Sequence, residues 1–348
     1  MTVGWARFCA HADTKPRGQT INLSAHPTLF SENKFTLVIR VRFKLMWRLD
    51  KPIEIIAPSG PAGTTDRTAR VVARILQKYK MVEVPVNVVN KPGGSGAIGY
   101  SYLNQHAGDG HYIIIGTSGS ISNYITGTVP FNHTDFTPVA MLFDEWMSVN
   151  VQAGSPMKTA RDLVERLKPN PDAFAFGIST SRSGGNFITL MTCLRAAGID
   201  IKRVKTVIFQ GGGATTLALL GGHVEAINTG PGNMVEFLRQ GKLRTLAISG
   251  PKRLWGPFAA VPTWREQGVP ASAGSWRGVQ GPRGMTPAQL AYWDSLFRKL
   301  VQTEDWKKDL EENFWVDAYA AAPEAKRVFE REYQEFKSIL TELGMSKL

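Results

Sequence analysis

Short runs of apolar residues alternate with glycine-rich loops and helical patterns from residue 52 to residue 286. The apolar runs predict strands, and the stretches after them, with apolar residues about 3.6 positions apart, predict helices. Strands that alternate with helices are typical of parallel β-α-β units. From Pro287 the pattern is helical to the end of the chain. The predicted strands cover residues 53–57, 84–89, 112–115, 174–178, 204–209, 224–228 and 243–249.

Two other apolar segments have a different form, because each ends at a proline turn. They cover residues 148–152 and 275–280. We interpret them as paired strands through which the chain crosses between two α/β lobes. The length of 348 residues agrees with this, since it is enough for two domains of ordinary size. The predicted organisation is an extension at residues 1–50, a first lobe at 51–151 plus 276–348, and a second lobe at 152–275.

The composition is that of an ordinary globular protein, with 43% hydrophobic and 20% charged residues. No run of about 18 apolar residues occurs, so no membrane-spanning helix is expected. The formal net charge is +12, and half of it comes from residues 1–51, where nine Lys or Arg accompany three acids. The remaining basic residues are scattered. This distribution supports a small anionic ligand and argues against nucleic acid as a partner.

Residues 1–50 lack the features of a secretory signal. The apolar stretch at residues 35–47 is interrupted by Arg40, Arg42 and Lys44, and its alternation is more typical of a strand than of a signal core. We interpret residues 1–50 as an atypical extension, disordered or not native to the mature protein. A true cytoplasmic N-terminus is the alternative, and an intact Met1 in the native protein would support it.

Cysteine and histidine usage predicts neither a disulfide nor a metal site. Cys9 lies in the atypical extension and Cys193 in an apolar helical stretch. The six histidines are scattered without metal-ligand spacing. The sequence has no Walker A loop, no G-x-S-x-G elbow and no pair of acids in a glycine loop. We therefore expect no catalytic residues, no cofactor and no enzymatic activity.

Four loops share the same chemistry, because each follows a predicted strand, opens a predicted helix and is rich in Gly, Ser and Thr. Glycine turns are common in β-α units, but open α/β sheets also bind ligands at this edge. The first turn of each helix has unpaired N–H groups and a partial positive charge, so four such loops, two in each lobe, can surround one small anion. The candidate ligand-binding residues are Ser59, Gly60, Ala62, Gly63, Thr64, Thr65, Asp66, Thr117, Ser118, Gly119, Ser120, Ser181, Arg182, Ser183, Gly184, Asn186, Gly211, Gly212, Gly213 and Ala214.

Three residues in or near these features have two interpretations each. Asp66, the only acid in the four loops, either contacts the ligand or stabilises the first turn of its helix. Arg182, the one basic residue inside a glycine loop, either binds a carboxylate in bidentate fashion or is a solvated loop charge. Trp276, which precedes Arg277 in the second crossing strand, is more typical of a core than of a ligand site.

One glycine pattern favours a different function. Residues 94–99 read G-S-G-A-I-G and match G-x-G-x-x-G, the fingerprint of dinucleotide sites. The context argues against such a site, because the pattern follows the second predicted strand and the nearest acid, Asp109, lies in a turn before a strand. A nucleotide-dependent enzyme is therefore kept as an alternative, which titration calorimetry with NAD, NADP or ATP would test.

Several longer motifs have the order and spacing of a known family. They are K-P-I at 51–53, followed by Asp66 after the first loop, then N-K-P-G-G-S-G-A-I-G at 90–99, D-F-T-P-V-A at 135–140, G-G-H-V-E at 221–225, G-K-L-R-T-L-A at 241–247 and V-P-T-W-R-E-Q-G at 261–268. In these motifs the chain resembles the tripartite tricarboxylate transporter substrate-binding proteins, also called Bug receptors, over about residues 50 to 346. W-R-G-V at 276–279 resembles the tricarboxylate-receptor branch.

This resemblance implies a type II, periplasmic binding protein-like α/β fold, with two lobes of parallel-type sheet joined by hinge strands. It implies a periplasmic receptor that closes on a small organic carboxylate, such as a citrate-like tri- or dicarboxylate, held by loop backbone groups and ordered waters. The implied partners are the large and small membrane subunits of the transporter, and the receptor is expected to be a monomer. A carboxylate sensor that presents its ligand to a signalling partner shares this fold and is the alternative.

The chain departs from the family pattern in its third glycine loop. The family usually has a His near the end of this loop, where Asn186 and Phe187 stand here, and it has small residues at the position of Arg182. The missing secretory signal is a second departure. The resemblance therefore leaves open which carboxylate binds and whether the protein is exported.

Overall fold

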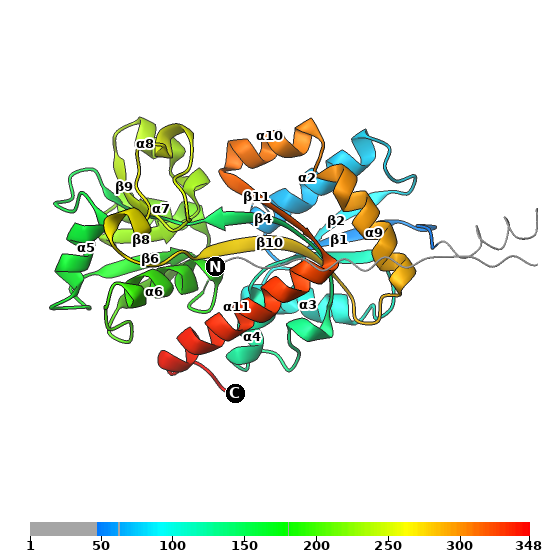
Figure 1. Cartoon of the computed structure of the whole chain (residues 1–348), viewed down its shortest axis with the longest axis horizontal. Helices are drawn as coiled ribbons and strands as arrows, with labels where there is room; N and C mark the ends of the chain where they lie inside the picture. The colour runs from blue at the N-terminus through cyan, green and yellow to red at the C-terminus, as the bar shows by residue number, and fades with distance from the viewer. Residues whose placement is uncertain (1–46, 62, 180) are drawn as a thin grey trace, which may run out of the picture. The chain divides into compact units, whose positions relative to one another are not determined.

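The first of two β-sheets combines parallel and antiparallel strands. The computed structural model describes residues 47–348 except residues 62 and 180, and the predicted N-terminal extension lies outside these residues but for its last four. The strand order is β11-β4-β10-β3-β1-β2, with β1 parallel to both β2 and β3 and with β10 antiparallel to β3 and β4 (Figure 1). The strands are β1 (Ile53–Ala57), β2 (Val86–Asn90), β3 (Tyr112–Gly116), β4 (Thr137–Trp146), β10 (Gly274–Gly281) and β11 (Trp315–Ala321).

The second sheet is built in the same way, with the order β7-β6-β8-β5-β9. Strand β6 is parallel to β7 and β8, whereas β5 is antiparallel to β8 and β9. The chain passes from the first sheet to the second at Met147, between β4 and β5, and returns to the first sheet at β10. The strands are β5 (Ser148–Gln152), β6 (Ala175–Ser179), β7 (Lys205–Phe209), β8 (Ala226–Thr229) and β9 (Leu243–Ile248).

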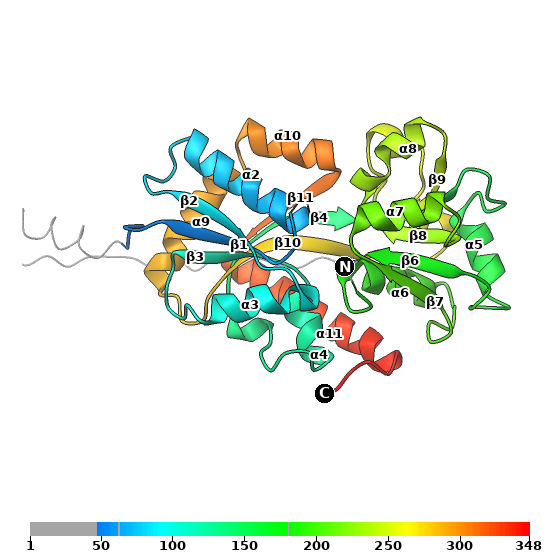
Figure 2. The ribbon, with the colours of Figure 1, turned by 180° about the vertical axis from the view of Figure 1, so that it is seen from behind.

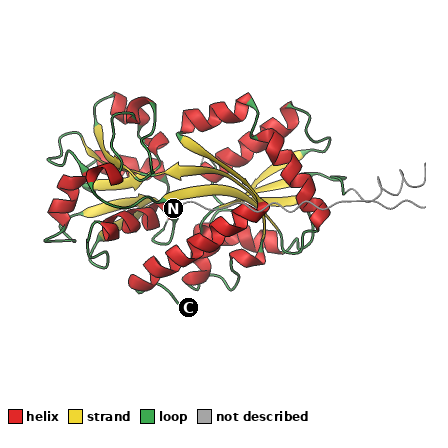
Figure 3. Cartoon of the chain, in the orientation of Figure 1, coloured by secondary structure: helices red, strands yellow, loops and turns green. Residues whose placement is uncertain are grey.

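Helices cover both faces of each sheet, as expected of β-α units. Figures 1 and 2 show α2 and α10 on one face of the first sheet and α3, α4 and α11 on the other. Figure 3 shows the same layers by type of secondary structure. The helices are α2 (Thr64–Lys78), α3 (Ala97–Asn104), α4 (Gly119–Ile125), α5 (Ala160–Leu167), α6 (Gly185–Ala196), α7 (Gly212–Leu220), α8 (Val235–Arg239), α9 (Pro287–Leu300), α10 (Glu304–Asn313) and α11 (Ala322–Glu342).

Two helices that do not follow glycine loops, α5 and α9, begin with a side-chain cap. The side chain of Thr159 accepts a hydrogen bond from the backbone N–H of Asp162, which caps α5, and Thr286 caps α9 in the same way through Gln289. By contrast, three of the four helices that open at the glycine loops, α2, α6 and α7, have Gly as N-cap and no side-chain cap. The N-cap residues of these three helices therefore contribute no side-chain hydrogen bond to the helix start.

Helix α11 joins the two halves of the fold. One hydrophobic cluster contains Met141 of β4, Phe176 of β6 and Leu190 of α6 together with Phe329 and Leu340 of α11. The C-terminal helix packs against β4 and β11 of the first sheet and against α6, which follows a strand of the second sheet. A separate cluster fills the other side of the first sheet, below α2, α9 and α10.

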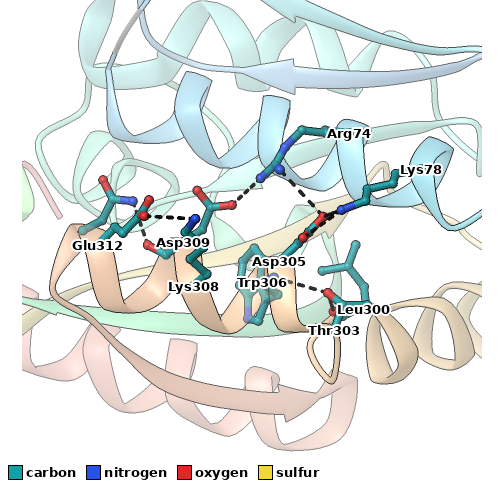
Figure 4. Close-up of polar contacts among 10 residues, drawn as sticks. Arg74, Lys78, Leu300, Thr303, Asp305, Trp306, Lys308, Asp309 and Glu312 are labelled. Carbon is teal, nitrogen blue, oxygen red and sulfur yellow. Dashed lines mark hydrogen bonds and ion pairs between the residues drawn. The ribbon is translucent and has the colours of Figure 1, made fainter.

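Charged side chains also link α2 to α10 on the outside of the first sheet. Figure 4 shows Arg74 with Asp305 and Asp309, and Lys78 with Asp305, where the Lys78 Nζ–Asp305 Oδ2 distance is 2.7 Å. The Arg74 and Lys78 side chains are 51% and 56% exposed. Exposed pairs of this kind contribute about 0–1 kcal/mol each.

The sequence patterns located nine strands, each within two residues of its observed ends. The prediction that the chain is helical from Pro287 to its end was wrong, because β11 lies between α10 and α11 and pairs with β4. Strand β4 was also not predicted. Both strands depend on pairing between segments far apart in the sequence, which a local pattern does not record.

Candidate functional site

A cavity of about 1010 Å³ lies where the two sheets meet, and loops from both sheets line it. The four glycine-rich loops all reach it, namely those before α2, α4, α6 and α7. The predicted residues that line the cavity are Ser59, Gly60, Gly63, Thr64, Thr65, Thr117, Ser118, Gly119, Ser181, Gly184, Asn186, Gly211, Gly212, Gly213 and Ala214.

Four other predicted residues do not line the cavity, and Ala62 lies outside the described residues. Asp66 is buried and accepts hydrogen bonds from Arg70 and Asn90, which fits the helix-stabilising interpretation. The hydroxyl of Ser120 is turned to the Thr117 carbonyl. Ser183 donates its backbone N–H to Ser181 Oγ.

Arg182 points away from the cavity. Its Nε donates to Thr206 Oγ1 at 3.1 Å and its Nη2 to the Thr206 carbonyl oxygen at 3.1 Å. The geometry therefore gives no support to the prediction that Arg182 binds a carboxylate, and it supports the alternative of a loop charge with structural hydrogen bonds.

Three of the loops present helix N-termini to the cavity. Helices α2, α6 and α7 begin here behind Gly63, Gly184 and Gly211, none of which has a side chain to cap the first N–H groups. Free N–H groups at a helix start attract anions, because they can donate hydrogen bonds and carry a partial positive charge. The cavity wall thus includes the starts of three helices, one from the first lobe and two from the second.

The loops approach each other so closely that only glycine fits at some positions. A Cβ atom on Gly185, at the start of α6, would lie 2.5 Å from Ser275 Oγ in β10. A Cβ atom on Gly119 would collide with the backbone carbonyl oxygen of Ser95. The absence of side chains at these positions brings the backbone of α6 and α4 up to the cavity.

A fifth loop also lines the cavity, although in the sequence its glycines were considered only as part of a dinucleotide fingerprint. Residues 92–96, which include the start of the G-x-G-x-x-G match, lie against the other loops. Ser95 has a φ of 54°, and Asn123 Nδ2 of α4 donates to the Gly94 and Ser95 carbonyl oxygens at 3.0 and 3.2 Å. The loop is thus held in a fixed shape by α4.

The third loop is fixed by amide side chains. Asn186 Nδ2 donates to Ser179 Oγ at 2.5 Å, and Asn228 Nδ2 donates to the Asn186 carbonyl oxygen at 2.7 Å. Asn186, which stands where the family usually has His, therefore ties the start of α6 to the end of β6. Its amide group also lines the cavity.

A buried ion pair on the cavity wall was not predicted. Arg277 of β10 and Glu145 of β4 are 8% and 7% exposed, and Arg277 Nη2 lies 3.1 Å from Glu145 Oε2. Burial lowers the pKa of the Arg277 guanidinium, and the Glu145 carboxylate partly offsets this effect. The sequence signal that could have identified this pair is the presence of a charged residue within each of two otherwise largely apolar segments.

Trp276 has a different role from its neighbour. It is 1% exposed, stacks on Phe329 of α11 and donates its Nε1–H to Glu332. This supports the interpretation of Trp276 as a core residue. The other cavity residues that were not among the predicted ones include Thr229, Gly230, Gly232, Asn233, Ser275, Asn313 and Trp315 from other segments, and Pro58, Pro61, Arg67, Ser179, Gly185 and Gln210 in or next to the predicted loops.

The charge on the cavity wall is small and positive. Among the described residues that line it, the charged ones are Arg67, Arg277 and Glu145, which gives a net charge of +1. Within the same described part of the chain, no group of three His, Cys, Asp or Glu side chains is arranged to hold a metal ion. The wall is otherwise made of hydroxyl groups, amides and exposed backbone.

No helix between residues 47 and 348, apart from the two positions not described, is both long enough and apolar enough to cross a membrane.

Comparison with protein families gives one match over most of the chain. A family described as "Tripartite tricarboxylate transporter family receptor" matches residues 68–345. Protein BugT of Bordetella pertussis is 29% identical over 259 residues, which cover 73% of this chain and 77% of BugT.

Solved structures show the same fold. A TctC solute binding protein from Polaromonas, solved without ligand, is 26% identical, with a TM-score of 0.69 over 84% of this chain and 99% of that one. A protein of R. palustris solved with adipate is 23% identical, with a TM-score of 0.75 over 86% and 99%. MatC of Rhodopseudomonas palustris, with bound malate, is 21% identical, with a TM-score of 0.71 over 84% and 99%.

Proposed function

The chain belongs to the tripartite tricarboxylate transporter receptor family, and from this premise we propose that it captures a small organic carboxylate in the cavity between its two lobes and delivers it to a tripartite transporter. The family is one of periplasmic solute-binding receptors. The proposed ligand is a di- or tricarboxylate, and the proposed partners are the large and small membrane subunits. We further propose that the protein is a monomer and works in the periplasm.

The observation that carries this proposal is the convergence of three uncapped helix N-termini on one cavity. Helices α2, α6 and α7 all begin at the wall of the same cavity, and Ser59, Ser118 and Ser181 also line it. Carboxylates are the small organic anions that such groups bind with directional hydrogen bonds. Two proteins of the same fold were solved with the dicarboxylates adipate and malate, which supports this class of ligand.

Hinge closure is the proposed mechanism of capture. The loops before α2 and α4 belong to the first lobe and those before α6 and α7 to the second, so a ligand that contacts both stabilises the closed arrangement. Bending would be concentrated where the chain crosses between the sheets, near Met147 and near the start of β10. The lobe boundaries given by the sequence, at residues 151/152 and 275/276, lie close to these crossings and are part of the proposal.

A thermal-shift screen of the full chain tests the proposed function. The panel contains mono-, di- and tricarboxylates, with NAD and ATP as tests of the nucleotide alternative. Binding to the folded state raises the unfolding free energy by RT ln(1 + [L]/Kd), so one carboxylate class should raise the melting temperature by several degrees. No shift with any carboxylate at high concentration would defeat the proposal, and a shift with NAD alone would favour the nucleotide-dependent enzyme.

A further inference from the structure

The Arg277–Glu145 pair contains two polar atoms that its structural contacts do not use. Arg277 Nη1 donates to Ser275 Oγ at 2.8 Å and to the Trp276 carbonyl oxygen at 2.8 Å, and Nη2 lies 3.1 Å from Glu145 Oε2. Among its other donors, the Nε–H group is buried and has no hydrogen-bond partner among the described residues. Within the same residues, Glu145 Oε1 accepts no hydrogen bond either.

Both residues belong to the cavity wall. They stand on adjacent antiparallel strands, where Ser275 of β10 is paired with Glu145 of β4. Glu145 Oε1 lies against Gly230, another residue of the wall, so closely that a side chain at Gly230 would collide with it. The structure therefore holds an unused donor and an unused acceptor of one ion pair at the edge of the proposed ligand site.

We propose that this pair is a subsite for the hydroxyl group of a hydroxycarboxylate. A hydroxyl oxygen accepts a hydrogen bond from Arg277 Nε–H, and the hydroxyl proton is donated to Glu145 Oε1. The inference deepens the proposed function and rests on it, because the carboxylate itself is assigned to the helix N-termini of the glycine loops. The ligand would thus bind at two places on the cavity wall with different chemistry.

The charges of the pair explain why a neutral group fits best. A second carboxylate next to Arg277 would also approach Glu145 and be repelled by it, and an ammonium group next to Glu145 would be repelled by Arg277. A hydroxyl group avoids both repulsions and is at once donor and acceptor. A buried N–H group without a partner is unfavourable, so a ligand that supplies an acceptor gains from the contact.

Matched ligand pairs on the wild-type protein test the inference directly. Titration calorimetry compares malate with succinate and citrate with tricarballylate, which differ in each case by one hydroxyl group. The hydroxylated member should bind roughly tenfold to a hundredfold more tightly, the effect of one hydrogen bond to charged groups. Equal affinities within each pair would overturn the hydroxyl subsite but leave the carboxylate receptor standing. No binding of any member would overturn the proposed function, and the subsite with it.

A variant of the acceptor provides the second test. Glu145→Gln keeps the size of the side chain but removes the carboxylate, so the preference for malate over succinate should fall below about threefold. Arg74→Gln is the matched control, because Arg74 also pairs with carboxylates but stands on the outer face of α2. A Glu145→Gln protein that retains the full preference would contradict the assignment of Glu145. Should the variant fail to fold, the wild-type ligand pairs still decide.

Discussion

Two sets of arginine–carboxylate pairs in this protein differ mainly in burial. Arg74 on α2 pairs with Asp305 and Asp309 on the outside of the first sheet, where its side chain is 51% exposed. Arg277 pairs with Glu145 on the cavity wall, where both residues are more than nine-tenths buried. Solvent screens the first set, whereas in the second each charge depends on the other for compensation. The same kind of ion pair therefore links two helices at the surface in one region and lies buried in the cavity wall in the other.

The largest expected effect comes from breaking the buried pair. Arg277→Ala leaves Glu145 buried without its cation, so the free energy of unfolding should fall by about 3–5 kcal/mol. Urea denaturation of the full chain measures it. A loss below about 1 kcal/mol, the range of exposed pairs, would mean that water reaches the pair, and the contrast with Arg74 would then disappear.

Glu332 of α11 is a partly buried residue whose carboxyl group has no cation at hydrogen-bond distance among the described residues, and it sharpens the comparison. Burial raises the pKa of Glu332 on α11 to about 8; the neighbouring Glu335 and Asp144 add to this effect, while the Trp276 hydrogen bond and Arg331 oppose it. Since the pKa in the unfolded chain is near its usual 4.5, the folded state holds the extra proton, and stability should fall as the pH rises from about 5 to 8.

Glu332→Gln should remove this decline while keeping an acceptor for Trp276 Nε1–H. At pH 8 the variant should be about 1–4 kcal/mol more stable than wild type, because a tenfold difference in proton affinity between the folded and unfolded states corresponds to about 1.4 kcal/mol. At pH 5 the two proteins should be nearly equal in stability. Denaturation curves at several pH values measure the difference. A difference that does not change with pH would contradict the raised pKa.

The close approach of backbone in the cavity can be tested by adding one methyl group. Gly119→Ala places a Cβ atom against the Ser95 carbonyl oxygen and should reduce stability by about 1–3 kcal/mol, because backbone must move to accommodate it. Gly213→Ala in α7 is the control, since its added Cβ meets no atom within 4 Å in the described part of the chain beyond its own helix and chain neighbours, and alanine favours helix by about 0.4–1 kcal/mol. Equal effects of the two substitutions on the midpoint of denaturation would contradict this packing.

The smallest effect is expected at the exposed pairs. Arg74→Gln should change the free energy of unfolding by less than about 1 kcal/mol, and the change should shrink further in high salt. Denaturation at low and high salt measures it. A salt-independent loss of about 3 kcal/mol, as for a broken buried pair, would show that the link between α2 and α10 resembles Arg277 and Glu145.

The sequence predicted the elements that depend on local pattern. Hydrophobic periodicity predicts the strands before the glycine loops, and the Gly, Ser and Thr content of four loops predicts that they come together. Most of the loops that line the cavity could therefore be predicted. Glu145 was missed because β4 is defined by its pairing with β10 and β11. Arg182 was considered a ligand-binding residue because of its positive charge. Only the folded chain shows that its guanidinium donates a hydrogen bond to Thr206, which is distant in the sequence.

Amide hydrogen exchange with and without a bound carboxylate tests the central claim most directly. The account predicts slower exchange in loops of both lobes at once, in particular at residues 63–66 before and within α2, and at residues 184–187 and 211–214 at the starts of α6 and α7. Exchange on the outer face, around Arg74 and Asp305, should stay unchanged. Protection confined to one lobe, or located outside the cavity loops, would contradict capture of a carboxylate between the lobes.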